Sequence, residues 1–163
     1  MKPCLIRSSR NFPELLSGAW LLLREPPFVT MLETLTIPLP PVTGIGSALS
    51  LFFALIIGHA LADFPLQGDF LSRGKNRHTE PPKLADGKQS PSDLWIYLMT
   101  AHALIHAGFV WLFTGLIVFA LAEFVLHWLI DAMKCEGKTS FAMDQWLHVL
   151  CKAVFVIILW VMA

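Results

Sequence analysis

The sequence predicts an all-α membrane protein, in which about four transmembrane helices form a bundle and a long polar loop joins the first two. Composition is the first observation: 55% of the 163 residues are hydrophobic and only 15% are charged. A soluble domain has about 25% charged residues. The second observation is that the apolar residues fall into four segments of about 18–23 residues, each long enough to cross a hydrocarbon layer of roughly 30 Å.

The four predicted helices cover residues 46–64, 92–113, 116–133 and 141–163. The first ends before Pro65, because proline disfavours helical backbone in the residue that precedes it. Ser92 is expected to cap the second helix, and Thr114 and Gly115 are expected to form the tight turn after it. Lys152 is the one charged residue from position 149 onwards. The last helix therefore lacks the polar face that a surface helix of a soluble bundle needs.

Residues 1–45 differ from the predicted transmembrane domain, which covers residues 46–163. From residue 36 the chain is rich in proline and glycine, and it cannot form the interior of a continuous helix there. Residues 1–30 contain a short apolar run after several basic residues, but no small-residue cleavage site of a signal peptide follows. We hypothesise that residues 1–30 are a dispensable extension of non-native origin, with Met31 as an alternative start.

Nine ionisable residues interrupt the apolar segments. They are His59, Asp63, His102, His106, Glu123, His127, Asp131, Asp144 and His148. An aspartate at the centre of a transmembrane helix costs about 2.5–3.5 kcal/mol even on the mildest insertion scale. Such residues are tolerated where they face the interior of a bundle and satisfy one another. Nine of them predict a functional polar cluster.

Each predicted helix carries one pair of these residues four positions apart. The pairs are His59 with Asp63, His102 with His106, His127 with Asp131, and Asp144 with His148. A separation of four places both side chains on one face of a helix. In an up-down-up-down bundle, the pairs lie roughly 8–15 Å from one membrane face, at about 1.5 Å per residue. The spacing therefore predicts that four helices bring their pairs to a single layer.

Imidazoles and carboxylates in one layer are nitrogen and oxygen ligands that suit divalent zinc, manganese or iron. One or two such ions are expected. The predicted ligands are His59, Asp63, His102, His106, His127, Asp131 and His148. A structural alternative stays open, in which His59 pairs with Asp63 and Asp144 pairs with His148 to lock the bundle together.

Two carboxylates are candidate catalytic groups. Glu123 lies one turn before His127, and Asp144 begins the last pair. Either could take a proton from water that a metal activates. Glu123 could instead be a ligand or orient His127. Lys152 shares the helix face of Asp144 and could neutralise a carboxylate.

The polar segment 65–91 follows directly after the first pair, so its side chains would overhang the site. The predicted substrate-binding residues there are Gln67, Arg73, Lys75 and Asn76. The alternative is a solvated connector without a role in binding.

Basic residues near the ends of the helices predict the orientation. They lie at the face where the predicted site opens, and they are Arg73, Lys75, Arg77, Lys83, Lys88, Lys134 and Lys138. Because basic loops stay in the cytoplasm, the segment 65–91 is expected to be cytoplasmic and the chain to be a multi-pass protein of the cell inner membrane.

Four stretches carry a resemblance to a known family: residues 59–77, 102–108, 123–137 and 144–152. They are similar to the bacterial and phage membrane proteins known as domain of unknown function 3307, over about residues 50–160. This resemblance implies no particular activity. The histidine and aspartate pattern is also similar in style to families described as membrane-bound metal-dependent hydrolases.

These observations favour a metal-dependent hydrolase that acts on a lipid-linked or amphiphilic substrate among membrane lipids. The alternatives are a non-enzymatic carrier of metal ions or protons and a haem-binding membrane protein. The formal net charge is zero, so no basic surface indicates a nucleic-acid partner.

Overall fold

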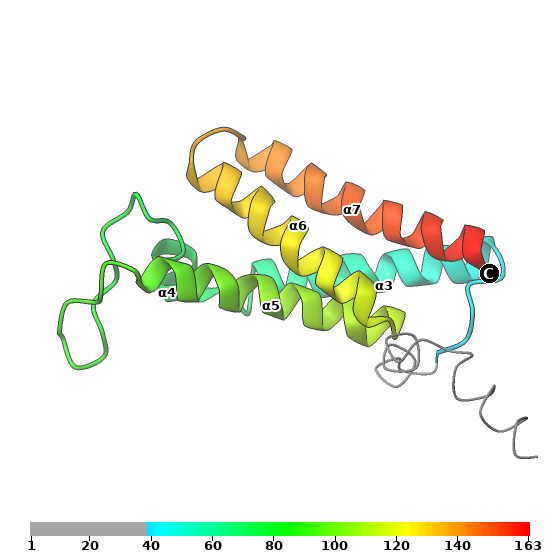
Figure 1. Ribbon diagram of the computed structural model, residues 1–163, viewed down its shortest axis with the longest axis horizontal. Helices are drawn as coiled ribbons and strands as arrows, with labels where there is room; N and C mark the ends of the chain where they lie inside the picture. Colours follow the sequence, from blue (N-terminus) through cyan, green and yellow to red (C-terminus); the bar gives the residue numbers. More distant parts are fainter. Residues whose placement is uncertain (1–38) are drawn as a thin grey trace, which may run out of the picture. The chain divides into compact units, whose positions relative to one another are not determined.

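The computed structural model describes residues 39–163 (Figure 1). The hypothesis about residues 1–30 falls outside the described residues. Five helices and no strand make up the described part of the chain, so the all-α prediction is confirmed there. The helices are α3 (Ile45–Asp63), α4 (Gly68–Gly74), α5 (Leu94–Thr114), α6 (Ile117–Cys135) and α7 (Phe141–Met162).

Local chemistry explains where the long helices begin and end. Helix α3 ends at Asp63, two residues before Pro65. Helix α5 is followed by Gly115, whose φ of 72° is a left-handed conformation that glycine adopts without strain. Before α7, the Ser140 hydroxyl accepts a hydrogen bond of 3.2 Å from the backbone N–H of Met143. This side chain caps one of the N–H groups that a helix start leaves unpaired.

Two local predictions are wrong. Ser92 does not cap α5, because the N-cap residue is Asp93, which makes no capping hydrogen bond with its side chain. The segment 65–91 is not a continuous loop, because it contains the seven-residue helix α4. A Cβ atom on Gly74 would lie 2.3 Å from Leu98 Cδ1, so α4 approaches α5 closely. Packing against α5 stabilises a helix that is too short to be stable alone.

The four long helices pack as a ring. Helix α3 packs against α5 and α7, and α6 packs against the same two helices, while α4 lies on α5. Figure 1 shows α6 and α7 side by side as an antiparallel hairpin. Apolar side chains fill one half of the ring, and its core residues are Ala48, Leu55, Val110, Phe119, Phe155 and Val156. The other half contains the ionisable residues.

Three of the helices, α3, α5 and α7, are long and apolar enough to cross a membrane. Helix α6 also has 19 residues, but it carries Glu123, Asp131 and Lys134 and does not belong to this class. Large apolar side chains face outward around the ring, among them Phe53, which is 66% exposed, and Leu112, which is 56% exposed. Soluble proteins rarely expose so much continuous apolar surface. Length and composition thus support three of the four predicted spans.

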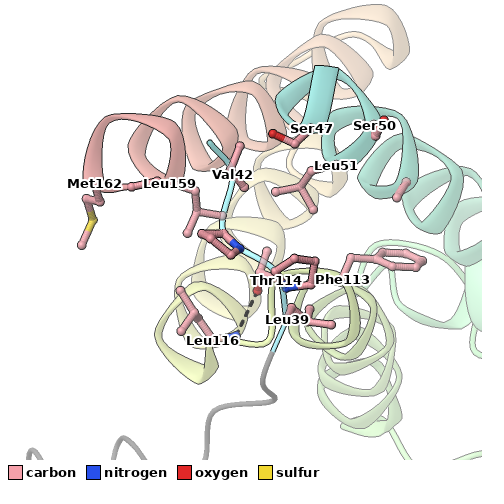
Figure 2. A pocket seen from close by; sticks show the side chains of 14 residues that line it. Leu39, Val42, Ser47, Ser50, Leu51, Phe113, Thr114, Leu116, Leu159 and Met162 are labelled. Atoms are coloured by element: carbon pink, nitrogen blue, oxygen red, sulfur yellow. Dashed lines mark hydrogen bonds between the residues drawn. The ribbon is translucent and has the colours of Figure 1, made fainter. Parts of the chain in front are cut away.

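A cavity of about 740 Å³ lies at the apolar end of the ring (Figure 2). The start of α3 and the ends of α5 and α7 form most of its wall, together with the segment before α3. Thr114 lines the cavity, but its hydroxyl already donates to the Val110 carbonyl and accepts from the Leu116 N–H. Apart from Thr114, Ser47 and Ser50 the wall is apolar, and the cavity lies at the end of α3 opposite His59 and Asp63.

Close packing between α3 and α5 generates a stability prediction. A Cβ atom on Gly58 would lie 2.9 Å from Phe113 Cε2 and 3.0 Å from Phe109 Cβ. We expect Gly58→Ala to lower the free energy of unfolding by about 1–3 kcal/mol, because the added methyl group overpacks this contact. The measurement is the loss of helical circular dichroism of detergent-solubilised protein during titration with dodecyl sulfate.

Gly108→Ala is the matched control, since Gly108 lies inside α5 and a Cβ atom there meets nothing within 4 Å. Alanine has the higher helix propensity, so this variant should be as stable as the wild type or slightly more stable. Equal losses in the two variants would contradict the close packing at Gly58.

Candidate metal centre

The nine ionisable residues predicted from the sequence all lie inside the ring. Most are almost fully buried, and Asp63, the most exposed, shows 9% of its side chain to solvent. The separation of four places each pair on the inward face of its helix, as the helix geometry requires. The structure therefore brings together residues from four helices that are up to 89 positions apart, from His59 to His148.

Five imidazoles form the centre of the cluster. The ring centroids of His106 and His127 are 3.6 Å apart, and those of His127 and His148 are 4.1 Å apart. His102 lies 4.7 Å from His106 and 5.0 Å from His127, measured between centroids. His59 lies 5.1 Å from His106 by the same measure. Positive charge on several of these rings would be repulsive at such distances, so the cluster favours neutral imidazoles, the form that binds metals.

One set of donor atoms consists of Asp63, His102, His106 and His127. One ligand atom from each residue lies within 4.8 Å of the others. Asp63 Oδ1 is 3.1 Å from His106 Nε2 and 3.2 Å from His102 Nε2. Three imidazole nitrogens and one carboxylate oxygen form a donor set of the kind that binds zinc in proteins.

A second set shares His127 with the first and adds Asp131 and His148. The Asp131 carboxylate lies 3.5 Å from His148 Nε2 and 3.8 Å from His127 Nε2. It is also 3.3 Å from His102 Nε2, so Asp131 stands between the two sets. The two sets are adjacent parts of one cluster.

Two side chains hold Asp63 in place from outside the first set. Gln145 donates a hydrogen bond of 2.7 Å from Nε2 to Asp63 Oδ2. His59 Nε2 is 3.6 Å from the same oxygen and 3.3 Å from Gln145 Oε1. His59 is absent from both donor sets, and it contacts His106 through Nδ1 at 3.4 Å. The structure thus places His59, predicted as a ligand, beside both donor sets but in neither of them.

Three lysines neutralise three of the four buried carboxylates. Lys152 donates to Glu123, Lys75 donates to Asp131, and Lys134 donates to Asp144 at 2.9 Å. Asp63 contacts histidines and Gln145, and within residues 39–163 it has no lysine or arginine partner. With neutral imidazoles, the cluster therefore has one uncompensated negative charge, and it lies in the first set.

Several donor atoms in the described part of the chain are buried without a hydrogen-bond partner. They include both ring nitrogens of His102 and of His127, and Nε2 of His148. His102 Nε2 is close to Asp63 and Asp131, yet it forms a hydrogen bond of proper geometry with neither. Native proteins rarely leave buried polar atoms unpaired. These unpaired atoms belong to residues whose ligand atoms lie close enough together to hold a metal ion.

The predicted substrate-binding residues divide into two groups. Lys75 is buried and contacts Asp131. Gln67, with its amide turned to satisfy both neighbours, donates to the Asp63 carbonyl at 2.9 Å and accepts from Lys75 Nζ at 2.7 Å. Arg73 is exposed on α4, and the Asn76 side chain accepts from the His78 N–H within a local turn. The structure therefore brings Gln67 and Lys75 to the cluster, but not Arg73 and Asn76.

Gln145 and Lys134 are site residues that sequence reasoning missed. Gln145 is uncharged and follows Asp144 directly, so a search for ionisable residues passes over it. Its signal is the separation of three from His148, which places both on neighbouring parts of one face. Lys134 lies three positions after Asp131, and in the sequence it indicates only the orientation of the chain.

The chain belongs to the family described as protein of unknown function (DUF3307), whose model matches residues 51–163. This confirms the resemblance found in the four sequence stretches. The matched range contains every residue of the cluster. No curated protein and no solved structure matches the chain.

The buried pair of Glu123 and Lys152 generates a prediction about stability. Both side chains are 1% exposed. We expect Glu123→Gln or Lys152→Met alone to lower the free energy of unfolding by about 3–5 kcal/mol, because each leaves a buried charge without its partner. The measurement is again unfolding in dodecyl sulfate, followed by circular dichroism.

The double variant Glu123→Gln/Lys152→Met is the control for this pair. It removes both charges, so it should recover most of the stability that each single variant loses. Losses that simply add in the double variant would show that the two charges do not depend on each other.

Proposed function

We propose that this protein is an integral membrane enzyme that holds one divalent transition metal between Asp63, His102, His106 and His127. One observation carries this proposal: the unpaired ring nitrogens of His102 and His127 and the uncompensated carboxylate of Asp63 belong to the same donor set. Each feature alone is unfavourable in an apolar bundle. A bound cation would remove both costs, because it accepts the nitrogen lone pairs and neutralises the carboxylate.

Charge favours one ion over two. The second donor set contains Asp131, which Lys75 already neutralises. A second divalent ion there would add positive charge beside an ammonium group, and repulsion would oppose it. The first set has a negative charge and no ammonium contact, so it is the favoured place for the metal. Its nitrogen and oxygen donors suit zinc, manganese or iron.

The proposed reaction is hydrolysis of an ester, phosphoester or amide bond in a lipid-linked or amphiphilic substrate. A bound divalent metal would act as a Lewis acid and lower the pKa of water toward about 7. Asp144 keeps Oδ1 without a hydrogen-bond partner, and this oxygen is 3.7 Å from His148 Nε2. We assign Asp144 the role of taking the proton from water and passing it to the leaving group.

Glu123 is better suited to orienting a ligand, although its Oε2 is also unpaired. Its Oε1 contacts Lys152 and lies 3.3 Å from His127 Nδ1. With a metal bound at Nε2, the proton of the neutral imidazole would stay on Nδ1, on the side of this carboxylate. Glu123 would then act through His127.

The position of the cluster also supports an enzyme over a proton or metal carrier. A relay across the membrane needs ionisable groups through both halves of the bundle. Here the apolar core residues Leu55, Val110 and Phe155 close the half of the ring beyond Glu123. This arrangement favours chemistry at one face of the membrane.

We further propose that α6 is a fourth span and that the segment between α3 and α5 lies in the cytoplasm. Helix α6 contains too many ionisable residues to count as a span by composition alone. Two of them, Glu123 and Asp131, are only 1% and 2% exposed within the ring. They would face partner side chains and not lipid. The basic residues at this end of the bundle support the cytoplasmic orientation in the cell inner membrane.

The first test measures metal in detergent-purified protein. We expect about one equivalent of zinc, manganese or iron, and we expect Asp63→Ala, His102→Ala or His106→Ala to lose most of it, since each removes one of four donors. Inductively coupled plasma mass spectrometry gives the content. His78→Ala is the control, because His78 contacts Glu136 in an exposed turn outside the cluster. Full metal content in the three cluster variants would contradict the proposal.

The second test measures topology in cells. Four spans place residue 80 and the C-terminus on opposite sides of the membrane, whereas three spans with α6 outside the bilayer would place them on the same side. Paired reporter fusions, one active only in the cytoplasm and one only outside it, distinguish the two cases. We expect cytoplasmic activity at residue 80 and external activity at the C-terminus, and the reverse pattern would overturn the orientation.

A further inference from the structure

A second cavity, of about 310 Å³, lies between α5 and α6 at the end of the bundle that carries α4. Its volume falls within the range of small-molecule sites. Trp95 in the first turn of α5 and Trp128 in α6 provide apolar walls, and the Cys135 thiol lies at the end of α6. Tryptophan is enriched where membrane helices meet the interface with water. The cavity therefore has the walls of an interfacial site.

Cations dominate the polar part of this cavity. Its lining includes Lys75, Arg77 and Lys138, against the single carboxylate of Glu136. Glu136 already contacts Arg77 at 2.7 Å and His78 at 3.1 Å. These hydrogen bonds hold the pKa of the Glu136 carboxyl below its ordinary value, so the carboxylate stays charged and paired. Lys138 is exposed, and the described residues offer it no acidic partner.

The cavity is one side chain away from the candidate metal centre. Lys75 lines the cavity, and its ammonium group contacts the Asp131 carboxylate of the cluster. Lys75 is 6% exposed, so it is a built part of the wall and not a mobile surface lysine. A group that enters this cavity and reaches Lys75 would lie next to the donor atoms.

We propose that this cavity binds the phosphate-bearing headgroup of an anionic lipid, with the phosphate held by Lys75, Arg77 and Lys138. Two lysines and one arginine in the wall of a single cavity provide the ammonium and guanidinium donors that the oxygens of a phosphate accept. This lipid would be the substrate of the proposed hydrolase, so its cleavage depends on the proposed function. The binding step stands on the cavity alone.

The apolar walls identify a lipid as the source of the phosphate. Trp95 and Trp128 would flank the acyl chains where they leave the headgroup, while the cations stay near the membrane face. Free phosphate would use the cations but not the tryptophans. A lipid should therefore bind more tightly than inorganic phosphate, and an anionic lipid more tightly than a zwitterionic one.

Alkylation of Cys135 tests binding in the full chain in detergent. Soluble short-chain phosphatidic acid is added before N-ethylmaleimide, and peptide mass spectrometry gives the rate of modification at Cys135. We expect saturating phosphatidic acid to slow this rate at least fivefold, because the lipid would cover the thiol. Phosphatidylcholine of the same chain length and inorganic phosphate, at the same concentration, should leave the rate almost unchanged.

Two lysine variants show whether the cations of the cavity are responsible. In Lys138→Ala, the concentration of phosphatidic acid that gives half-maximal protection should rise about tenfold, because one good charged contact is lost. Lys83→Ala removes the same charge from the exposed segment before α5, outside the cavity. In this variant phosphatidic acid should protect Cys135 as well as it does in the wild type. Equal weakening in both variants would overturn the site, as would equal protection by phosphatidylcholine. Protection by inorganic phosphate as strong as that by the lipid would overturn the lipid as the ligand.

Metal content of the same preparations separates this proposal from the proposed function. Protection that is specific for phosphatidic acid in protein without metal would sustain the lipid site and contradict the metal centre. Full metal content without protection would contradict the lipid site and leave the metal centre intact.

Discussion

Burial of four carboxylates in an apolar bundle is the constraint on which the rest of the structure depends. An uncompensated buried charge costs several kcal/mol, so each carboxylate needs a partner for the helices to stay together. The lysine partners come from three places: Lys152 from α7, Lys134 from the end of α6, and Lys75 from the C-terminus of α4. Charge pairing therefore joins α6 to α7 and ties the segment 65–91 to the bundle. Asp63 has no such partner among the described residues, and this exception defines the site.

The two halves of the ring divide stability from chemistry. In one half, Leu55, Val110 and Phe155 are buried among apolar neighbours and need no partner for hydrogen bonds. The other half contains imidazoles and carboxylates, and only some of their polar atoms have a hydrogen-bond partner. The apolar half and the lysine pairs can hold the helices at fixed distances while the histidine nitrogens stay available. Donor atoms that are preorganised in this way bind a ligand without the cost of gathering them.

Sequence reasoning predicted the long helices and the layer of ionisable residues because both follow from periodicity. A spacing of four fixes a helix face, and distance along the helix fixes depth, so His59, His106, His127 and His148 could be brought together without a structure. Partners across helices could not be predicted, because they depend on how each helix is rotated and how far a long side chain reaches. Lys75 follows a polar stretch that resembles a solvated loop, yet its ammonium group reaches Asp131, 56 positions away. For the same reason, the carboxylate without a cation could be identified only from the fold.

Lys75 links the candidate metal centre to the proposed lipid site, and this link has a consequence for both. The ammonium group can neutralise Asp131 or a phosphate in the cavity, but its full charge is not available to both at once. A lipid phosphate that draws Lys75 toward the cavity would leave Asp131 more negative, beside His127 and His148. The negative charge of the cluster would then increase when substrate is present, and a cation held by Asp63, His102 and His106 would be bound more tightly. The two proposals together therefore imply positive coupling between lipid and metal, which is reciprocal by thermodynamic necessity.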